Sequence, residues 1–472
     1  MKVVLVAPPT PNPSPTYFGP PMGLALLGAL LEARGHSVRG YDWDRSTLEA
    51  MLDDLPRLLA EDRPELFGIS CLSITRGQSF ALARRVRELA PSVPIIFGGP
   101  YPSIEPVEIL ERTPADFVCI GDGEETLPEL CDALGEGRDP KSVPGLCLRA
   151  ASGTERTAPR PDFTELDRLP YPNLDLFDVR GELEKRRRND AAERDQGLSS
   201  KGRPPYLART ALMVLGSRGC VWRCDFCPMS KFKGRTRMHS PAYVADYIEY
   251  LVNRYDQREF VFGDNTLTWH RPHAVELFER LAAKRLDISW ICMTRADRVD
   301  PELLRLMRAA GCREISYGIE SGSPEVQQAM RKKLKLGSVV RAFHDTHDAG
   351  INSTCMLMIG NRGETRESVR ATSGLVRDAD PDRILIWTTR LYPGTVLHDV
   401  AVAEGVISRD YYADEMAPAP FYTGENSSAE LSKLETLLQH RAIWVDASPE
   451  VPSPTSIETC ASRRGAPRPA SS

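Results

Sequence analysis

The first 145 residues alternate between short, continuously apolar runs and longer amphipathic stretches. Continuous apolar strands separated by helices are typical of a parallel sheet that is covered on both faces. We therefore predict an α/β domain of the doubly wound, flavodoxin-like type over residues 1–145. The predicted strands are 3–7, 38–43, 67–72, 95–98 and 117–120, and the predicted helices are 23–34, 47–59, 79–89, 107–112 and 126–134.

A second series of the same kind begins near Thr210. Several of its helices start with proline, which the first helical turn tolerates. Six strand–helix units are too few for a complete eight-stranded barrel, so we predict a partial (β/α)6 TIM-type barrel within residues 206–400. The predicted strands are 212–215, 260–262, 288–293, 314–318, 354–359 and 384–388, and the helices start near Pro241, Pro272, Pro301, Pro324, Val339 and Thr365.

Three further segments lack a long stretch of regularly spaced hydrophobic residues. Residues 146–205 are rich in proline and then in charge, which predicts a connector with a solvated, charged loop. In the C-terminal extension, 401–446, Ser427 and Glu430 form a possible capping box for a helix over 428–444. Residues 447–472 are rich in Pro, Ser and Ala, which predicts a disordered tail.

Length and charge exclude several classes of protein. A chain of 472 residues predicts two or three domains. The net charge of −5 argues against a nucleic-acid partner, because no basic excess exists to neutralise phosphates. No apolar stretch is long enough to span a membrane, and the first residues do not form a secretory signal. We therefore expect a cytoplasmic protein without a membrane partner.

The cysteines divide into two groups. Eight of the eleven are scattered singly, several of them inside apolar runs, where a cysteine behaves as a small hydrophobic residue. Only three cluster, which indicates a reducing compartment and one metal site. The scattered cysteines are Cys71, Cys119, Cys131, Cys147, Cys292, Cys312, Cys355 and Cys460.

The clustered cysteines are Cys220, Cys224 and Cys227, spaced C-x-x-x-C-x-x-C just after the first strand of the second series. Thiolates suit an iron–sulfur cluster or zinc. Structural zinc needs a closed set of four ligands, and His239 is the nearest candidate for the fourth. A four-iron cluster held by three thiolates would keep one iron open. The spacing favours the cluster and leaves zinc, or a chance pattern, as the alternatives.

This segment resembles the signature of the radical S-adenosylmethionine (SAM) superfamily, and the resemblance extends over about residues 212–393. It implies that the three cysteines bind a [4Fe–4S] cluster whose open iron is chelated by the amino and carboxylate groups of SAM. Reductive cleavage of SAM would then release a 5′-deoxyadenosyl radical that abstracts a hydrogen atom.

Polar residues follow the later strands, where the active site of a barrel lies. The resemblance implies that Asp264 lies near the methionine amino group, that Arg295 lies near the carboxylate, and that Glu320 lies near the ribose. It also places Phe226 beside the adenine. Each of these residues could instead be a surface charge or a residue that packs at the rim. The predicted SAM-binding residues are Phe226, Asp264, Arg295, Gly318, Glu320 and Ser321.

The strand ends of the first domain resemble the cobalamin-binding domain that precedes many radical SAM enzymes. Glycines there would let a broad, planar macrocycle approach the backbone. The domain lacks the D-x-H-x-x-G ligand loop, its only histidine is His36, and Tyr101 stands where relatives often have histidine. The alternative is a domain that binds nothing or a nucleotide, although no G-x-G-x-x-G motif is present. The predicted cobalamin-binding residues are Pro8, Pro9, Ser70, Ser73, Gly98, Gly99, Gly121, Gly123 and Glu124.

Together these features resemble cobalamin-dependent radical SAM methyltransferases. Such an enzyme would methylate an unactivated carbon, or phosphorus, of a secondary-metabolite intermediate through methylcobalamin and the 5′-deoxyadenosyl radical. A cyclase or ring-rearranging enzyme without net methylation is the first alternative, and a non-catalytic metal-binding protein is the second. A methylthiotransferase is disfavoured because the first domain has no second cysteine triplet. The expected partners are a small-molecule substrate and an electron donor such as flavodoxin or ferredoxin; the sequence assigns no catalytic residue.

Overall fold

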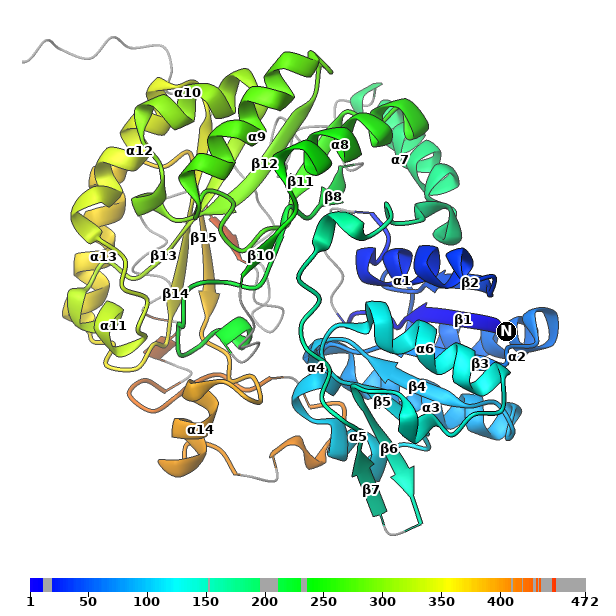
Figure 1. Cartoon of the computed structure of the whole chain (residues 1–472). Helices are drawn as coiled ribbons and strands as arrows, with labels where there is room; N and C mark the ends of the chain where they lie inside the picture. The colour runs from blue at the N-terminus through cyan, green and yellow to red at the C-terminus, as the bar shows by residue number, and fades with distance from the viewer. Residues whose placement is uncertain are drawn as a thin grey trace, which may run out of the picture. The chain divides into compact units, whose positions relative to one another are not determined.

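The computed structural model describes residues 1–11, 19–151, 153–195, 211–230, 236–408, 411–417, 419–427, 430–431, 433 and 444–446 (Figure 1). By its internal contacts the chain forms two compact units. Unit 1 comprises Met1–Lys185, Ser217–Tyr243 and Arg390–Pro420. Unit 2 comprises Arg186–Gly216, Val244–Thr389 and Phe421–Ser472. The segment with the three clustered cysteines therefore belongs to unit 1, although it directly follows the first strand of unit 2. The predicted linear domain boundaries stay a prediction.

Unit 1 contains a seven-stranded sheet in the order β2-β1-β3-β4-β5-β6-β7. Its first five strands are parallel, and all five are at the predicted places. The flavodoxin-like, doubly wound fold is thereby confirmed. The strands are β1 (Lys2–Ala7), β2 (Ser37–Asp42), β3 (Leu66–Ser70), β4 (Ile95–Gly98), β5 (Phe117–Cys119), β6 (Leu146–Ala150) and β7 (Gly153–Arg156).

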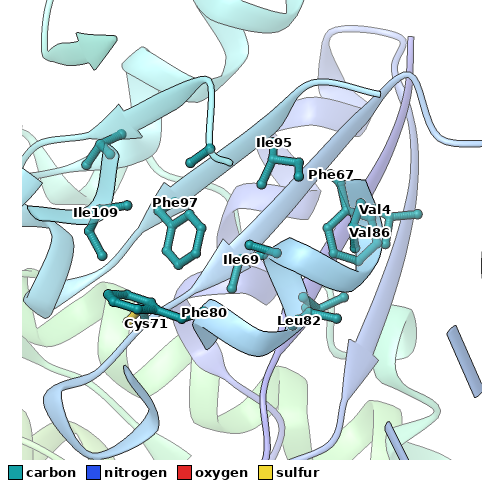
Figure 2. Close-up of a cluster of buried hydrophobic side chains, with 14 of the residues drawn as sticks. Val4, Phe67, Ile69, Cys71, Phe80, Leu82, Val86, Ile95, Phe97 and Ile109 are labelled. Carbon is teal, nitrogen blue, oxygen red and sulfur yellow. The ribbon is translucent and has the colours of Figure 1, made fainter. Parts of the chain in front are cut away.

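Helices cover both faces of this sheet. On β1, Val4 and Val6 enter one core with α2, α3 and α5, whereas Val3 and Leu5 enter another core with α1 and α6. This division follows from the pleat, since neighbouring side chains of a strand point to opposite faces. Figure 2 shows the first core. The helices are α1 (Met22–Ala33), α2 (Leu48–Asp62), α3 (Arg76–Leu89), α4 (Pro100–Ile104), α5 (Pro106–Arg112) and α6 (Gly123–Gly135).

The segment predicted to be a connector contains more regular structure than expected. Strands β6 and β7 form a hairpin that adds to the sheet in the antiparallel sense. The predicted charged loop is instead helix α7 (Val179–Asp195) as far as the structure describes it. Leu183 is 1% exposed and Arg186 is 7% exposed, three positions apart on one face of this helix. Burial of that face stabilises a helix that the charge pattern alone did not predict.

Unit 2 contains seven parallel strands in the order β16-β15-β14-β13-β12-β11-β8. Among the described residues this series of strands has two ends, β16 and β8, so it forms an open barrel, as predicted. The six predicted strands are confirmed. The strands are β8 (Leu212–Val214), β11 (Glu259–Phe262), β12 (Ser289–Thr294), β13 (Cys312–Glu320), β14 (Asn352–Ile359), β15 (Arg383–Thr388) and β16 (Trp444–Asp446).

Strand β16 corrects one prediction. Trp444 was expected to end a helix, but it pairs with Ile384 at the edge of β15. The backbone groups of an edge strand are open to pairing. The hydrogen bonds that Trp444 gains there come from a distant part of the chain, so the local sequence pattern does not indicate them. The capping box of the predicted helix is present, because Glu430 N donates to Ser427 Oγ over 3.3 Å and Ser427 N donates to Glu430 Oε2 over 3.0 Å. Residues 434–443 of that helix and the predicted tail, 447–472, lie outside the described residues.

Helices line the outer face of the strands of unit 2 (Figure 1). Trp290 of β12 stacks on Phe278 of α9 at 5.3 Å between ring centroids, and Tyr317 of β13 meets Phe343 of α12 at 5.0 Å. The alternate residues of these strands therefore point to the inner face. The helices are α8 (Pro241–Tyr255), α9 (Arg271–Lys284), α10 (Pro301–Ala309), α11 (Pro324–Ala329), α12 (Val339–Asp348) and α13 (Arg366–Ala379). No helix within the described ranges is long and apolar enough to cross a membrane.

A short segment of unit 1, residues 411–417, crosses helices α3 and α5. Glu415 accepts from Arg84 over 2.6 and 2.8 Å and from Arg112 over 3.2 Å. The backbone carbonyl of Asp414 accepts from the buried Arg76 over 2.7 Å. These contacts join the C-terminal part of unit 1 to its N-terminal sheet domain.

Candidate active site

The three clustered cysteines lie on a loop between two short strands, β9 (Ser217–Arg218) and β10 (Arg237–Met238). Cys224 is buried, Cys220 and Cys227 are half-buried, and none of the three is in a disulfide. Cys227 N donates to Cys224 O over 3.2 Å, which closes a turn between two of them. Helix α14 (Val396–Ala403) holds the same turn, because Leu397 N donates to Asp225 O over 3.0 Å. Phe226, predicted to lie beside the adenine, is half-buried on this loop.

The surroundings of His239 argue against a zinc site. Its Nδ1 lies 3.2 Å from Asp167 Oδ1, and its ring stacks on Tyr243 at 4.0 Å between centroids. Burial lowers the pKa of His239 to about 4. In the part of the chain that the structure describes, no group of three or more His, Cys, Asp or Glu side chains could hold a single metal ion. Three thiolates fit a four-iron cluster better, because each one binds a different iron atom.

The scattered cysteines have a packing role. The seven that the structure describes are buried and free, as predicted. Burial raises the pKa of Cys71, Cys119 and Cys131 to about 12, which keeps these side chains as neutral thiols. Only a thiolate binds metal well, so these residues do not compete with the triplet. Cys460 lies outside the described residues.

The residues predicted to bind cobalamin gather at the carboxyl ends of the strands of unit 1. Three hydrogen bonds connect the ends of β3, β4 and β5: Cys71 N to Gly98 O at 2.9 Å, Ser103 Oγ to Gly99 O at 2.9 Å, and Gly121 N to Ser103 Oγ at 3.0 Å. The other predicted residues lie at the same edge. Pro8 and Pro9 follow β1, Ser70 ends β3, Ser73 starts the next turn, and Gly123 and Glu124 start α6.

This edge fits a planar macrocycle. Gly99 has φ +108°, and a Cβ there would lie 3.0 Å from Cys71 O. A Cβ on Gly121 would meet nothing within 4 Å, so its backbone is open to a ligand. Leu72 and Ile74, which sequence reasoning missed, are 41% and 46% exposed on the loop after β3. Exposed large apolar side chains at a ligand-binding edge suit the face of a corrin ring.

The structure also places His36 and Tyr101, the two residues of this domain considered as possible histidine-ligand positions. His36 is held at the amino end of β2, where Nδ1 lies 3.1 Å from the Met1 amino group and Nε2 lies 3.0 Å from Asp132. It is therefore at the end of the sheet opposite to the predicted cobalamin residues. Tyr101 is 1% exposed, donates to Glu108 and accepts from Arg76 over 3.4 Å, so its hydroxyl belongs to a buried polar network.

In unit 2, two of the residues predicted to bind SAM form hydrogen bonds with neighbouring groups of the protein. Asp264 is 2% exposed and accepts from Gly216 N over 3.0 Å, which joins the ends of β11 and β8. Arg295 is 4% exposed and donates to both carboxylate oxygens of Asp297 over 2.8 and 2.9 Å. It also donates to the carbonyls of Lys332 and Lys333 over 2.8 and 3.0 Å. These bonds favour a positioning role for Arg295, and its contact with the SAM carboxylate stays a prediction.

Glu320 ends β13 in an unusual conformation. Its φ is +66°, and the pairing with β14 shifts register at this point. A positive φ is rare outside glycine and is often found at functional sites. Glu320 Oε1 lies 2.6 Å from Lys332 Nζ, and both side chains are buried. A Cβ on Gly318 would lie 2.9 Å from each of these atoms, so a larger residue there would displace the ends of both side chains.

Lys332 is therefore a residue of the candidate site that sequence reasoning missed. Ser321, which was predicted to bind SAM, is 1% exposed and lies 3.3 Å from Thr372 through its hydroxyl, so it supports the loop after β13. Glu364, after β14, was also missed. It accepts from Gly360 N over 2.5 Å, and burial raises its pKa to about 7.

Comparisons with known proteins agree with this arrangement. The model of the radical SAM superfamily matches residues 214–376, and the model of the B12 binding domain matches residues 14–131. The chain carries the two domains of the cobalamin-dependent radical SAM enzymes. It therefore uses a [4Fe–4S] cluster, SAM and cobalamin, and the alternatives of a zinc protein and a non-catalytic metal-binding protein are wrong.

Relatives of this cobalamin-dependent radical SAM enzyme include both methyltransferases and cyclases by name. An uncharacterized methyltransferase of Pyrococcus horikoshii is 28% identical over 86% of this chain and 84% of its own length. The anaerobic magnesium-protoporphyrin IX monomethyl ester cyclase of a Synechocystis strain is 26% identical over 94% of this chain and 87% of its own length. The family therefore does not decide between the two reactions.

A solved structure shares the fold. The radical SAM methyltransferase TsrM from Kitasatospora setae, with tryptophan substrate and a SAM analogue bound, matches with a TM-score of 0.68. The match covers 86% of this chain and 77% of that one at 22% identity. In our cobalamin-dependent radical SAM enzyme the roles of the individual SAM and cobalamin residues stay predictions, which the contacts described above support to different degrees.

Proposed function

We propose that this enzyme methylates an unactivated carbon, or phosphorus, of a small secondary-metabolite intermediate. When bound, the cluster and SAM supply the 5′-deoxyadenosyl radical, and cobalamin carries the methyl group. The protein's own part is to bind the substrate, orient it and keep water away from the reacting atoms. We further propose that a flavodoxin or a ferredoxin delivers the electron.

The inner face of unit 2 carries this proposal. It is polar at the amino ends of the strands, where the carboxylate of Glu314 accepts from Thr354 and, over 2.7 Å, from Arg383. The stretch between this polar group and the pair Glu320–Lys332 at the carboxyl ends is different. There, all described side chains that point inwards are apolar, except for that of Ser316. They comprise Met213, Leu215, Val261, Ile291, Met293, Met356, Met358, Leu385 and Trp387.

These inner side chains are not fully packed. Met293 is 40% exposed and Leu215 is 36% exposed, and the other apolar positions are half-buried. A complete barrel fills its interior with packed side chains, so this inner face leaves room for a small molecule. Among the described residues between the two polar pairs, no charged side chain points inwards. Such surroundings suit a carbon centre that reacts through a radical, since no acid or base is required there.

The enzyme should be tested anaerobically, fully reconstituted, with SAM that carries an isotopically labelled methyl group. Candidate substrates would come from the pathway encoded by the neighbouring genes. We expect a product that contains the labelled methyl group, together with 5′-deoxyadenosine and S-adenosylhomocysteine. A changed substrate without the label, accompanied by 5′-deoxyadenosine, would refute methyl transfer and support the cyclase alternative.

Two observations support the alternative to a smaller extent. A named cyclase matches nearly the full length of this chain. The apolar inner face would also accommodate a ring-forming substrate. The labelled-methyl experiment separates the two reactions, because only methyl transfer consumes the methyl group of SAM.

A further inference from the structure

Two arginines flank the loop that carries the cluster cysteines. Arg218 lies on β9, Arg237 lies on β10, and the two residues are paired across this antiparallel ribbon. The cysteines lie on the 18 residues between them, 219–236. Any contact that fixes both arginines therefore fixes both ends of the cluster loop.

Both arginines bind the loop after β5 of the sheet domain, within unit 1. Arg218 Nη1 lies 2.5 Å from Glu124 Oε1 and 3.6 Å from Asp122 Oδ1. Arg237 Nη1 donates to Asp122 Oδ2 and, over 2.8 Å, to the carbonyl of Phe163. Asp122 also accepts from Phe163 N over 3.1 Å, which fixes its carboxylate.

This cluster is largely shielded from water. The side chains of Glu124 and Arg237 are 8% and 12% exposed, and those of Arg218 and Asp122 are 22% and 21% exposed. Ion pairs that are shielded in this way hold geometry more firmly than surface pairs, which are screened and mobile. The loop after β5, in which Gly121, Gly123 and Glu124 were predicted to bind cobalamin, thus has a second set of partners.

Two buried atoms of this cluster, Glu124 Oε2 and Arg237 Nε, have no hydrogen-bond partner among the described residues. A buried carboxylate oxygen without a donor is costly, and such a group in a native site points to a missing ligand. Glu124 starts α6 beside Gly121 and Gly123, at the edge where the predicted cobalamin residues gather. The amide side chains of cobalamin are N–H donors, which a carboxylate oxygen accepts well.

We propose that Asp122 and Glu124 clamp the cluster loop to the cobalamin-binding edge, and that Glu124 links the two cofactors. Its Oε1 holds Arg218, and its Oε2 accepts a hydrogen bond from an amide of cobalamin. Asp122, Arg218 and Arg237 are positioning residues in this scheme, and Glu124 also contacts the cofactor. The inference rests on the cofactors of the family and not on methyl transfer, so it can fail independently of the proposed function.

The test compares three variants of the full-length chain. Glu124→Gln keeps the shape of the side chain and removes its charge. Arg218→Gln breaks the ion pair with Glu124 by changing the arginine instead, and it leaves Glu124 Oε2 unchanged. Glu125→Gln is the matched control, because Glu125 is the adjacent residue of α6, is 46% exposed and pairs with Arg160 instead.

The first measurement is hydrogen exchange of residues 217–238, before and after reconstitution of the cluster. We expect Glu124→Gln and Arg218→Gln to speed exchange about tenfold, as the loss of one charge-assisted hydrogen bond predicts. Glu125→Gln should exchange at the unchanged rate. Arg218 lies on the short strand β9 and its side chain is 22% exposed, so Arg218→Gln does not threaten the fold. Unchanged exchange in this variant would overturn the clamp.

The second measurement is a spectroscopic titration with hydroxocobalamin. We expect Glu124→Gln to bind it about tenfold more weakly than Arg218→Gln and Glu125→Gln do, because only Glu124→Gln alters the acceptor. Equal affinity in all three variants would refute the link to cobalamin. The link would also be refuted if Arg218→Gln lost as much affinity for hydroxocobalamin as Glu124→Gln does. In that case the position of the cluster loop, and not Glu124 Oε2, would determine the affinity.

Discussion

The buried pair between Glu320 and Lys332 gives the sharpest prediction from unit 2. At 2.6 Å between Lys332 Nζ and Glu320 Oε1, an effective dielectric constant of about 20 gives an attraction of about 6 kcal/mol. The two side chains are only 11% and 9% exposed, so desolvation opposes much of this attraction. Replacing Lys332 with methionine, however, keeps the buried carboxylate and removes its partner. Breaking a buried pair in this way costs about 3–5 kcal/mol.

We therefore expect Lys332→Met to lower the Tm of unit 2 by about 6–12 °C, taking the lower end of that cost and a domain of this size. The assay is differential scanning calorimetry of the full-length chain without cofactors. The matched control is Lys333→Met, because Lys333 is the adjacent residue and is exposed. The control should stay within about 1 °C of the parent protein, as surface substitutions usually do.

A double variant tests the reasoning itself. Glu320→Gln combined with Lys332→Met removes both charges, so it should be more stable than Lys332→Met alone. The argument is refuted if Lys332→Met has the same Tm as the control Lys333→Met. It is also refuted if the double variant is no more stable than Lys332→Met. In the reconstituted enzyme, Lys332→Met should also weaken SAM binding if Glu320 contacts the ribose.

Three other predictions concern separate parts of the chain. Cys224→Ser should abolish assembly of the cluster, so that iron per chain falls from about four to near zero by metal analysis; retained iron would exclude Cys224 as a ligand. Glu364 has a folded-state pKa of about 7, above its unfolded value of 4.5, so its contribution to stability is greatest below pH 4.5 and is lost as the pH rises to about 7. Denaturant titrations should measure the loss in unfolding free energy between pH 4.5 and pH 7. In Glu364→Gln this loss should be smaller by about 3 kcal/mol than in the parent protein, whereas in the exposed Glu367→Gln it should be unchanged. Glu415→Gln should release residues 411–417 from Arg84 and make them more sensitive to limited proteolysis, and an unchanged cleavage rate would contradict a holding role for that ion pair.

The elements that the sequence predicted correctly have strong local patterns. Most of the parallel strands are apolar runs, because helices cover both faces of the sheet in unit 1 and the outer face of the strands in unit 2. Strand β16 has no such pattern of its own, and it exists because β15 offers an unpaired edge to Trp444–Asp446. Helix α7 is highly charged, and the burial of Leu183 depends on tertiary packing. Both elements are decided by contacts between residues that are distant in the sequence, and those contacts are not visible in a local window.

The candidate site divides in the same way. Position at a strand end was sufficient to select Arg295 and Glu320, since polar residues gather there in a barrel. Their common partner, Lys332, could not be found by this rule because it lies twelve residues after Glu320, beyond α11. The chain returns through Arg331 and Lys333, both with positive φ, and so brings the Lys332 side chain to Glu320 and its carbonyl to Arg295. One residue thus couples two strand ends that the sequence analysis treated as independent.

The loop after β5 shows why a motif and its contacts must be considered separately. From the sequence, the position of this loop at a strand end indicated a cofactor site, and Gly121, Gly123 and Glu124 were predicted to bind cobalamin. The structure gives the two carboxylates protein partners, Arg218 and Arg237, and keeps one buried oxygen of Glu124 without a partner among the described residues. A carboxylate has two oxygens, so it can bind the cluster loop and a cofactor at the same time. Contacts with protein therefore do not exclude Glu124 from the cobalamin site; they explain how the two cofactors of this enzyme could be held by one side chain.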